Sequence, residues 1–370
     1  MNLGLYVHIP FCKSKCRYCD FNSYAKMEAF IKPYFSALMK EAEYYKNTVQ
    51  NVDTVYFGGG TPTSVEPKLL GQAVKTLFEI FDISNDAEIT AECNPGTIDL
   101  DGLRVLRQSG INRLSIGLQT TDDEKLKVLG RIHNFDDFKR CFENARTAGF
   151  DNLSLDLMYG LPDQSLEDWE KTLDAVKDFG AEHISCYSLK IEDGTPFAKM
   201  KLNLPDDDLA ADMYELAVKK LAEQGYDRYE ISNFAKPGKE SQHNLKYWRC
   251  DDFVGLGAGA YSCVGERRFS NICKIDEYIA AVQQNGSAEN WSSTQSIEEQ
   301  MSEFMFLGLR CSKGVCDSDF KARFGVSFNE VFGEVINKYT DWGFLVFDSD
   351  YLRFSDKGFF VSNTILSDFV

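Results

Sequence analysis

The sequence predicts an α/β fold, a TIM-like partial (β/α)6 barrel followed by a small C-terminal α+β module. Two patterns carry this prediction. Short runs rich in β-branched residues alternate with longer amphipathic segments through the first two thirds of the chain. A polar or glycine-rich stretch then follows each of those runs. Six β-then-α units imply a parallel sheet with right-handed crossovers, and six are too few for a closed eight-unit barrel.

The predicted elements follow one another in strict alternation. The strands are predicted at 3–9, 53–59, 87–93, 112–119, 152–160 and 183–190. The helices are predicted at about 27–46, 67–81, 99–109, 122–128, 135–148 and 165–179. Gly110 and Gly149 each close one of these helices, at the position where glycine relieves a left-handed backbone.

The stretches after the strands indicate where function lies. In order they read HIPFC, GGGTP, ECNPGT, GLQTTDDE, DLMYGLP and SLKIEDGTP. The carboxyl ends of parallel barrel strands face one rim, and barrel active sites lie on that rim. Glycines, prolines and carboxylates gathered there favour an enzyme or a cofactor-binding protein over a purely structural domain.

The pattern changes after residue 205, so a barrel domain is predicted over 1–205. A helix near 206–224 opens a region of turns and short strands, and residues 206–285 are predicted to complete the barrel. The polar segment 283–296 is predicted to be a linker.

The last segment, 297–370, is predicted to be a separate helical and hairpin module. Three helical patterns precede GFLVFDSDYLRFSDKG, which is a hairpin pattern with its turn near Asp348–Asp350. Helices followed by a small hairpin are typical of a winged-helix-like module.

Composition excludes several classes of function. The net charge of −17 argues against a nucleic-acid partner held through phosphates, and against binding to anionic membrane by charge alone. The sequence contains no apolar run long enough for a transmembrane helix, and its first residues lack the pattern of a signal peptide. We therefore expect a cytoplasmic protein, whose eleven cysteines are reduced and serve as metal ligands or small buried hydrophobes.

Three of those cysteines form the strongest chemical signal. Cys12, Cys16 and Cys19 follow the first predicted strand with C-x3-C-x2-C spacing. Three thiolates can ligate three irons of a [4Fe–4S] cluster and leave the fourth iron open to a chelating ligand. A zinc site is the alternative, with His8 as its fourth ligand, although structural zinc sites usually combine two ligand pairs.

This cysteine motif resembles the signature of the radical S-adenosylmethionine (radical SAM) enzymes, with Tyr18 as the aromatic before the last cysteine. In that family the open iron is chelated by the amino and carboxylate groups of the cofactor's methionine. The six-strand count is similar to the family's partial barrel. The GGGTP stretch after the second strand fits as well, because glycines let backbone groups approach a ligand closely.

More narrowly, the chain resembles the branch that holds oxygen-independent coproporphyrinogen III oxidase and the HemW-type haem chaperones. The resemblance runs through LYVHIPFC, CRYCDFNSY, ECNPGT, SIGLQ, LGRIH, YEISNFAKPG and HNLKYW. It implies that Tyr6 and Tyr18 lie beside the cofactor. It also implies further cofactor contacts, which are Gly59, Gly60 and Thr61 at the methionine part and Glu92, Gln119, Arg131 and Asp156 at ribose, carboxylate or a second cofactor molecule. Independently, a carboxylate such as Glu92 can accept from ribose hydroxyls, and Arg131 can pair with a carboxylate.

Two features separate the chaperone from the oxidase. The oxidase pattern has a further cysteine where this chain has Phe21, which puts coproporphyrinogen oxidation in doubt. The HNLKYW segment matches the chaperone motif H-N-x-x-Y-W, whose residues here are His243, Asn244, Tyr247 and Trp248.

The chemistry of that motif suits haem. His243 offers an imidazole to haem iron, and the two aromatic rings offer flat faces to a macrocycle. The lysines and arginine of 235–249 predict a basic patch for the haem propionates. A histidine packed in a loop is the plain alternative. Other candidate iron ligands are His8, His133, His183 and Cys250.

A last motif, GLGAGA at 255–260, resembles a dinucleotide fingerprint, but it lacks the βαβ context, and a packing loop is the better interpretation.

The resemblance implies haem as cargo, haem-accepting apoproteins and a reductant protein such as flavodoxin or ferredoxin as partners. A purely structural cluster in a dimer, a homodimer and peripheral membrane association through partners stay open.

Overall fold

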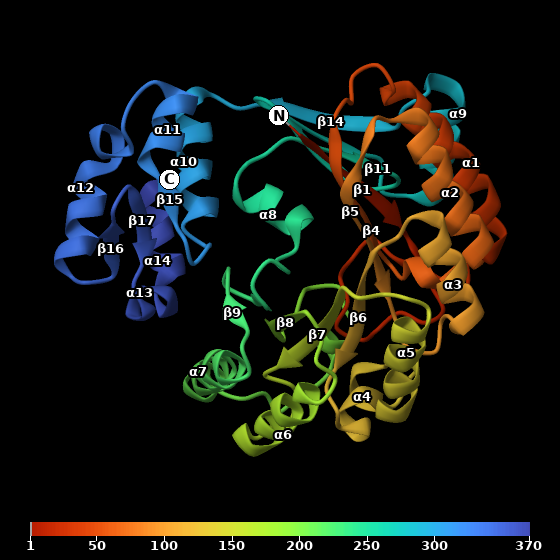
Figure 1. Cartoon of the computed structure of the whole chain (residues 1–370), viewed down its shortest axis with the longest axis horizontal. Helices are drawn as coiled ribbons and strands as arrows, with labels where there is room; N and C mark the ends of the chain where they lie inside the picture. The colour runs from red at the N-terminus through yellow and green to blue at the C-terminus, as the bar shows by residue number, and fades with distance from the viewer. Residues whose placement is uncertain (1) are drawn as a thin grey trace.

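The computed structural model describes residues 2–370 and confirms the alternation of strands and helices (Figure 1). The parallel strands of the main sheet are β1 (Leu3–Ile9), β4 (Val52–Gly59), β5 (Ile83–Cys93), β6 (Arg113–Gln119), β7 (Leu153–Tyr159), β8 (His183–Ser188) and β11 (Phe253–Leu256). The helices between and after the first six are α1 (Glu28–Tyr45), α2 (Pro67–Ile80), α3 (Leu100–Ser109), α4 (Asp123–Leu129), α5 (Phe135–Thr147), α6 (Leu166–Lys177) and α7 (Asp207–Glu223).

The sheet continues beyond the predicted six strands on both sides. Strand β11 joins β1 in parallel, although about 240 residues separate them along the chain. Antiparallel strands then extend this edge, namely β12 (Tyr261–Val264), β13 (Arg267–Asn271) and β14 (Glu289–Thr294). On the other edge, β10 (Asn233–Ala235) and β9 (Asp227–Arg228) follow β8.

The prediction of a linker at 283–296 is wrong for most of that segment. Its first residues end helix α9 (Ile275–Asn285), and residues 289–294 form β14, which pairs with β13 from Arg267 to Asn271. The segment resembles a linker because its side chains are almost all exposed. Pairing with β13, and not burial, makes it a strand.

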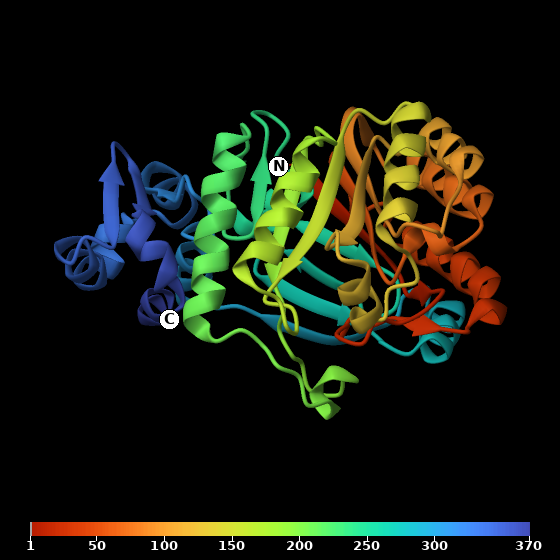
Figure 2. The same cartoon turned by 90° about the horizontal axis from the view of Figure 1, so that it is seen from below.

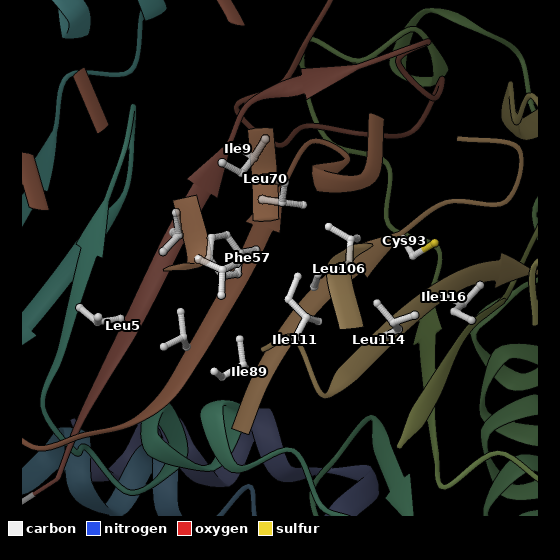
Figure 3. Packing of buried hydrophobic residues seen from close by; sticks show 14 of the residues in the cluster. Leu5, Ile9, Phe57, Leu70, Ile89, Cys93, Leu106, Ile111, Leu114 and Ile116 are labelled. Atoms are coloured by element: carbon white, nitrogen blue, oxygen red, sulfur yellow. The ribbon is translucent and has the colours of Figure 1, made fainter. Parts of the chain in front are cut away.

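The core lies between the sheet and the helices on its outer face (Figures 2 and 3). Leu5, Phe57 and Ile116 from three strands and Leu70 and Leu106 from two helices are at most 1% exposed. Burial on this scale stabilises each side chain by about 1.5–3 kcal/mol relative to exposure. The opposite face of the same strands is left to line the barrel interior.

The C-terminal segment has a buried cluster of its own, around Met305, Phe320, Phe328 and Leu352. Its elements are α10 (Ile297–Gly308), β15 (Val315–Cys316), α11 (Asp317–Phe324), α12 (Phe328–Asp341), β16 (Leu345–Asp348), β17 (Tyr351–Phe354), α13 (Asp356–Phe360) and α14 (Ser362–Leu366). The predicted hairpin is confirmed, with Ser349 in the left-handed region at its turn. The winged-helix-like assignment stays a prediction.

The GLGAGA segment is a packing loop in the structure. The backbone N–H of Gly257 donates to the buried carboxylate of Glu41 at 2.8 Å. Gly257 has a φ of 102°, and a Cβ there would lie 2.5 Å from the hydroxyl of Tyr34. The glycine is therefore needed so that the loop can approach α1 closely.

Within residues 2–370, none of the helices combines the length and the apolar character that crossing a bilayer requires.

Candidate functional site

A cavity of about 290 Å³ opens at the carboxyl end of the parallel strands, on the predicted rim. All three cysteines of the motif line it, with Cys12 at the end of β2 (Phe11–Cys12) and the other two in the loop that follows. Within the described chain, residues 2–370, no three His, Cys, Asp or Glu side chains are arranged to hold a single metal ion. Three thiols that line one cavity fit a larger inorganic cluster.

Two of the thiols accept a hydrogen bond from a neighbouring side chain. The hydroxyl of Thr61 donates to the Sγ of Cys12 at 3.6 Å, and the guanidinium of Arg131 donates to the Sγ of Cys16 at 3.5 Å. Burial raises the pKa of the Cys12 thiol, and the Thr61 hydroxyl opposes this shift. Donors placed against sulfur are typical of iron–sulfur sites, because they stabilise the negative charge of the ligands.

The glycine turn after β4 lies directly beside Cys12. Gly59 has a φ of 113°, and a Cβ on Gly60 would lie 2.7 Å from the carbonyl oxygen of Phe11. Both positions therefore require glycine if the turn is to pack against the strand that carries the cysteine. Gly59, Gly60 and Thr61 all line the cavity, as the resemblance implies.

Two half-buried carboxylates face the same cavity. Glu92, at the end of β5, accepts from the hydroxyl of Tyr56 at 3.2 Å and from the N–H of Gly59 at 3.1 Å. Burial, together with the charge of Asp156, raises the pKa of Glu92 to about 7. Asp156, on β7, accepts from the hydroxyl of Ser115 at 2.9 Å, and burial raises its pKa as well. Such groups can accept from the hydroxyls of a bound ligand.

The remaining implied cofactor contacts are grouped around Arg131. Besides Cys16, this guanidinium donates to the carbonyl of Gly117 at 2.7 Å and to Asn94. Gln119 lines the cavity with a left-handed φ of 72°, which a non-glycine residue adopts only when its surroundings hold it there. Tyr18 also lines the cavity.

Tyr6 is the exception, since it lies one layer away from the cavity. Its hydroxyl bonds to the Nδ1 of His8 at 3.0 Å, and its ring stacks on the cavity-lining Tyr56 at 6.3 Å.

The HNLKYW segment forms the short helix α8 (Gln242–Trp248), whose residues do not share one site. His243 is 1% exposed, with its Nδ1 bonded to the hydroxyl of Thr54 at 2.9 Å and its Nε2 to the hydroxyl of Tyr247 at 2.8 Å. Burial lowers the pKa of His243 to about 3. Asn244 lines the cysteine cavity, whereas Trp248 lines a second cavity. Iron ligation by His243 stays a prediction. It would require the imidazole to break at least one of these two hydrogen bonds.

The predicted basic patch over 235–249 does not form as a unit. Lys246 is 6% exposed and pairs with Asp53 at 2.7 Å, and Lys236 donates to the carbonyl of Gly180 at 2.7 Å. Arg249 lies apart from them and is exposed at the second cavity. Sequence proximity suggested one shared patch, but the fold directs these side chains to different neighbours.

Other histidines are as enclosed as His243. His8 and His183 each have both ring nitrogens hydrogen-bonded within the protein, and His133 is buried with neither nitrogen bonded. None of these rings is more than 6% exposed.

Several lining residues were missed by sequence reasoning, and they share one signal. Alternate residues of the strands point into the barrel, so Arg113, Ser115 and Gly117 of β6 line the cavity beside the predicted Gln119. On β8 the same holds for His183, Ser185 and Tyr187. Polar residues at every second position of a buried strand therefore predict an interior site, which attention to the rim alone overlooks.

The comparisons with known proteins agree with this geometry. A family model described as the Radical SAM superfamily matches residues 6–176, and one described as the HemN C-terminal domain matches residues 295–361. "Heme chaperone HemW" of Bacillus subtilis is 36% identical over 99% of this chain and 98% of its own length. The protein of that name from Escherichia coli is also 36% identical, over 100% of this chain and 98% of its own.

A solved structure covers the same span. The structure titled "Coproporphyrinogen III oxidase (HemN) from Escherichia coli is a Radical SAM enzyme" superposes with a TM-score of 0.89 at 25% identity, over 100% of this chain and 90% of that one.

Proposed function

Because the chain belongs to the radical SAM superfamily, in the branch of the HemW haem chaperones, we propose that it binds haem and delivers it to haem-accepting apoproteins. The observation that carries this proposal is the match to relatives of that name over essentially the whole of both chains. A cytoplasmic location and a reductant protein as electron donor belong to the same proposal.

The cofactor part of the proposal places a [4Fe–4S] cluster on Cys12, Cys16 and Cys19. Gly59, Gly60 and Thr61 would hold the methionine part of S-adenosylmethionine beside it. Glu92 and Asp156 would accept from ribose, with Arg131 and Gln119 near the carboxylate. When bound, the cluster supplies an open iron that chelates the methionine and an electron that can cleave the cofactor.

The rival function is oxidative decarboxylation of coproporphyrinogen III. The structural likeness to the oxidase is the reason to consider it. The residue that disfavours it is Phe21. This side chain is 62% exposed and lines the cysteine cavity, where the oxidase pattern has a cysteine.

The experiment that tests the proposed function is an anaerobic haem titration of the protein with its cluster reconstituted, followed by transfer to a haem-free globin. Saturable binding of one haem per chain, and transfer faster than release to buffer, is the expected result. Absence of saturable binding contradicts the chaperone function. Conversion of coproporphyrinogen III to a decarboxylated product would establish the rival.

A further inference from the structure

A second, larger cavity lies between α8 and the C-terminal module. Its volume is about 1030 Å³, and its walls come from α8, α10, α11 and the loop before β15. Figure 1 shows α8 placed between the main sheet and the C-terminal helices. Ligand pockets for drug-sized molecules measure about 300–1,000 Å³, so this cavity has room for a large planar ligand.

The chaperone motif reaches this cavity through Trp248. The side chain of Trp248 is half-buried, and its indole Nε1 is shielded from solvent without a hydrogen-bond partner among residues 2–370. Leu245, on the same side of α8, and Phe304, on α10, add apolar surface. An aromatic ring with aliphatic and aromatic neighbours is a wall on which a flat macrocycle can stack.

Cations with no acidic partner stand at the same cavity. Arg249 and Lys313 are exposed there, and neither makes an ion pair with a carboxylate in the described part of the chain, although the Lys313 ammonium lies 4.5 Å from the centre of the Tyr351 ring. Arg323 donates to the carbonyl of Cys250 at 3.0 Å, so it is held in place but keeps its charge. The acids at the cavity are Glu240, Asp251 and Asp319. Free cations beside an apolar wall suit a flat ligand that carries carboxylates.

Cys311 offers a sulfur ligand for iron in this cavity. None of the four histidines lines it. Cys311 lines it, is 8% exposed and has no side-chain hydrogen bond among the described residues, whereas Cys316 is bonded to Ser318 and Asp350. Cysteine is a known ligand of haem iron.

The cysteine cavity is an inferior alternative for the cargo. At about 290 Å³ it is less than a third of the size of the second cavity. On the proposed function it must already hold S-adenosylmethionine beside the cluster, which leaves no volume for a tetrapyrrole.

On the basis of the proposed function, we propose that haem binds in the second cavity. The macrocycle stacks on Trp248, its propionates pair with Arg249 and Lys313, and Cys311 ligates the iron and releases its thiol proton to solvent. His243 then acts as a positioning residue, which holds α8 to Thr54.

The test is haem titration of the full-length protein with its cluster, comparing variants of the two cavities. Arg249→Glu/Lys313→Glu reverses the free cations, and Ala322→Trp fills the space from the exposed face of α11. Each should weaken haem binding about tenfold or more, or about 1.4 kcal/mol. Lys68→Glu/Lys75→Glu, on exposed positions of α2, is the charge-matched control and should bind as wild type does. Unchanged cluster absorbance and S-adenosylmethionine binding show that the variants are folded.

The iron ligand has its own readout. Cys311→Ser should shift the Soret band of the complex, whereas His243→Gln, which keeps hydrogen-bonding groups, should leave the band unchanged. Saturating S-adenosylmethionine should not displace bound haem, because the two ligands occupy different cavities.

The outcomes separate this site from the function. If the wild type binds haem and the second-cavity variants bind equally well, the site is overturned and the chaperone function stands. A band shift in His243→Gln but not in Cys311→Ser would overturn Cys311 as ligand. If the wild type fails to bind haem saturably, the proposed function itself fails.

Discussion

At the scale of single residues, two side chains donate hydrogen bonds to the cysteine sulfurs. Thr61 and Arg131 each direct a donor at one sulfur; Thr61 follows strand β4, and Arg131 lies in the loop between α4 and α5. Hydrogen bonds to cluster ligands favour the reduced, more negative state, so they raise the reduction potential.

Replacing Thr61 by valine should therefore lower the reduction potential of the cluster. The change keeps the side-chain volume and removes the donor to Cys12, together with the acceptor that the hydroxyl offers to the amide of Asn94 at 2.8 Å. Redox titration followed by electron paramagnetic resonance measures it. Thr63→Val is the matched control, since Thr63 is equally buried but bonds to Thr97 and not to a thiol. Equal potentials in wild type and Thr61→Val would contradict the role given to this hydroxyl.

Glu92 should make the binding of S-adenosylmethionine depend on pH. Burial raises the pKa of its carboxyl to about 7, so the group is neutral below that pH and ionised above it. The ionised form accepts more strongly from hydroxyls, so affinity should rise as the pH passes from about 6 to about 8. Glu92→Gln should bind about tenfold more weakly at the upper pH, as expected for loss of a hydrogen bond to a charged group of about 1.5–3 kcal/mol.

Equilibrium binding by calorimetry at several pH values measures this effect. A pH profile in Glu92→Gln with the same slope as in the wild type would assign the dependence to another group, of which the neighbouring Asp156 is the first to examine.

Individual residues were predicted from sequence to different degrees. Cys12, Cys16 and Cys19 were predicted together because their spacing is local. Arg113 was missed because its role depends on which face of β6 points inward. The hydrogen bond of His243 to Thr54 could not be predicted either, since Thr54 is distant in sequence.

At the scale of elements, Glu41 ties α1 to three other segments. Its carboxylate accepts from Tyr278 on α9 at 2.6 Å, from Asn271 on β13 at 2.6 Å and from the N–H of Gly257. Burial nevertheless raises its pKa to about 7, from the usual value of 4.5 for a glutamate carboxyl.

This pKa predicts a loss of stability with rising pH. The folded state holds the Glu41 proton more tightly than the unfolded chain, so the stabilisation is complete below pH 4.5 and disappears as the pH rises to about 7. The difference amounts to about 3 kcal/mol. Chemical denaturation should show that the free energy of unfolding decreases less between about pH 5 and about pH 8 in Glu41→Gln than in the wild type. Equal decreases in the two proteins would show that other buried acids, such as Glu230, cause the pH dependence.

Most elements were predictable because their patterns are local. Alternation of apolar runs set the six strands, and glycine and capping residues set the helix ends. Strand β14 was missed because its pairing with β13 comes from tertiary structure, while its sequence is polar throughout. The same reason hides β11 beside β1.

At the scale of the whole molecule, the chain carries separate buried clusters in the barrel and in the C-terminal module. Contacts between the two include polar ones, such as the Ser312 hydroxyl with the carbonyl of Arg228 at 2.6 Å and Arg268 with Glu303, and an aromatic one between Tyr214 and Phe360. Such a boundary opens more readily than a continuous core.

We therefore expect the module to open as a unit before the barrel does. Native-state hydrogen exchange should give the amides of α10, α12 and β17 one shared opening free energy, lower than that of β4, β5 and β6. A single value across both regions would contradict the division at residue 297. The second cavity, which this boundary creates, was beyond prediction, because its walls come from segments that sequence patterns do not place together.

Helix α8 forms a wall that the two cavities share. Its seven residues separate the two cavities, with Asn244 facing one and Trp248 the other. A ligand on either side that shifts this shared wall changes the energy of occupancy on the other side. By thermodynamic reciprocity, whatever factor S-adenosylmethionine applies to the affinity for haem, haem applies to the affinity for S-adenosylmethionine. A chaperone that carries haem would then bind its own cofactor with a different affinity from the haem-free protein.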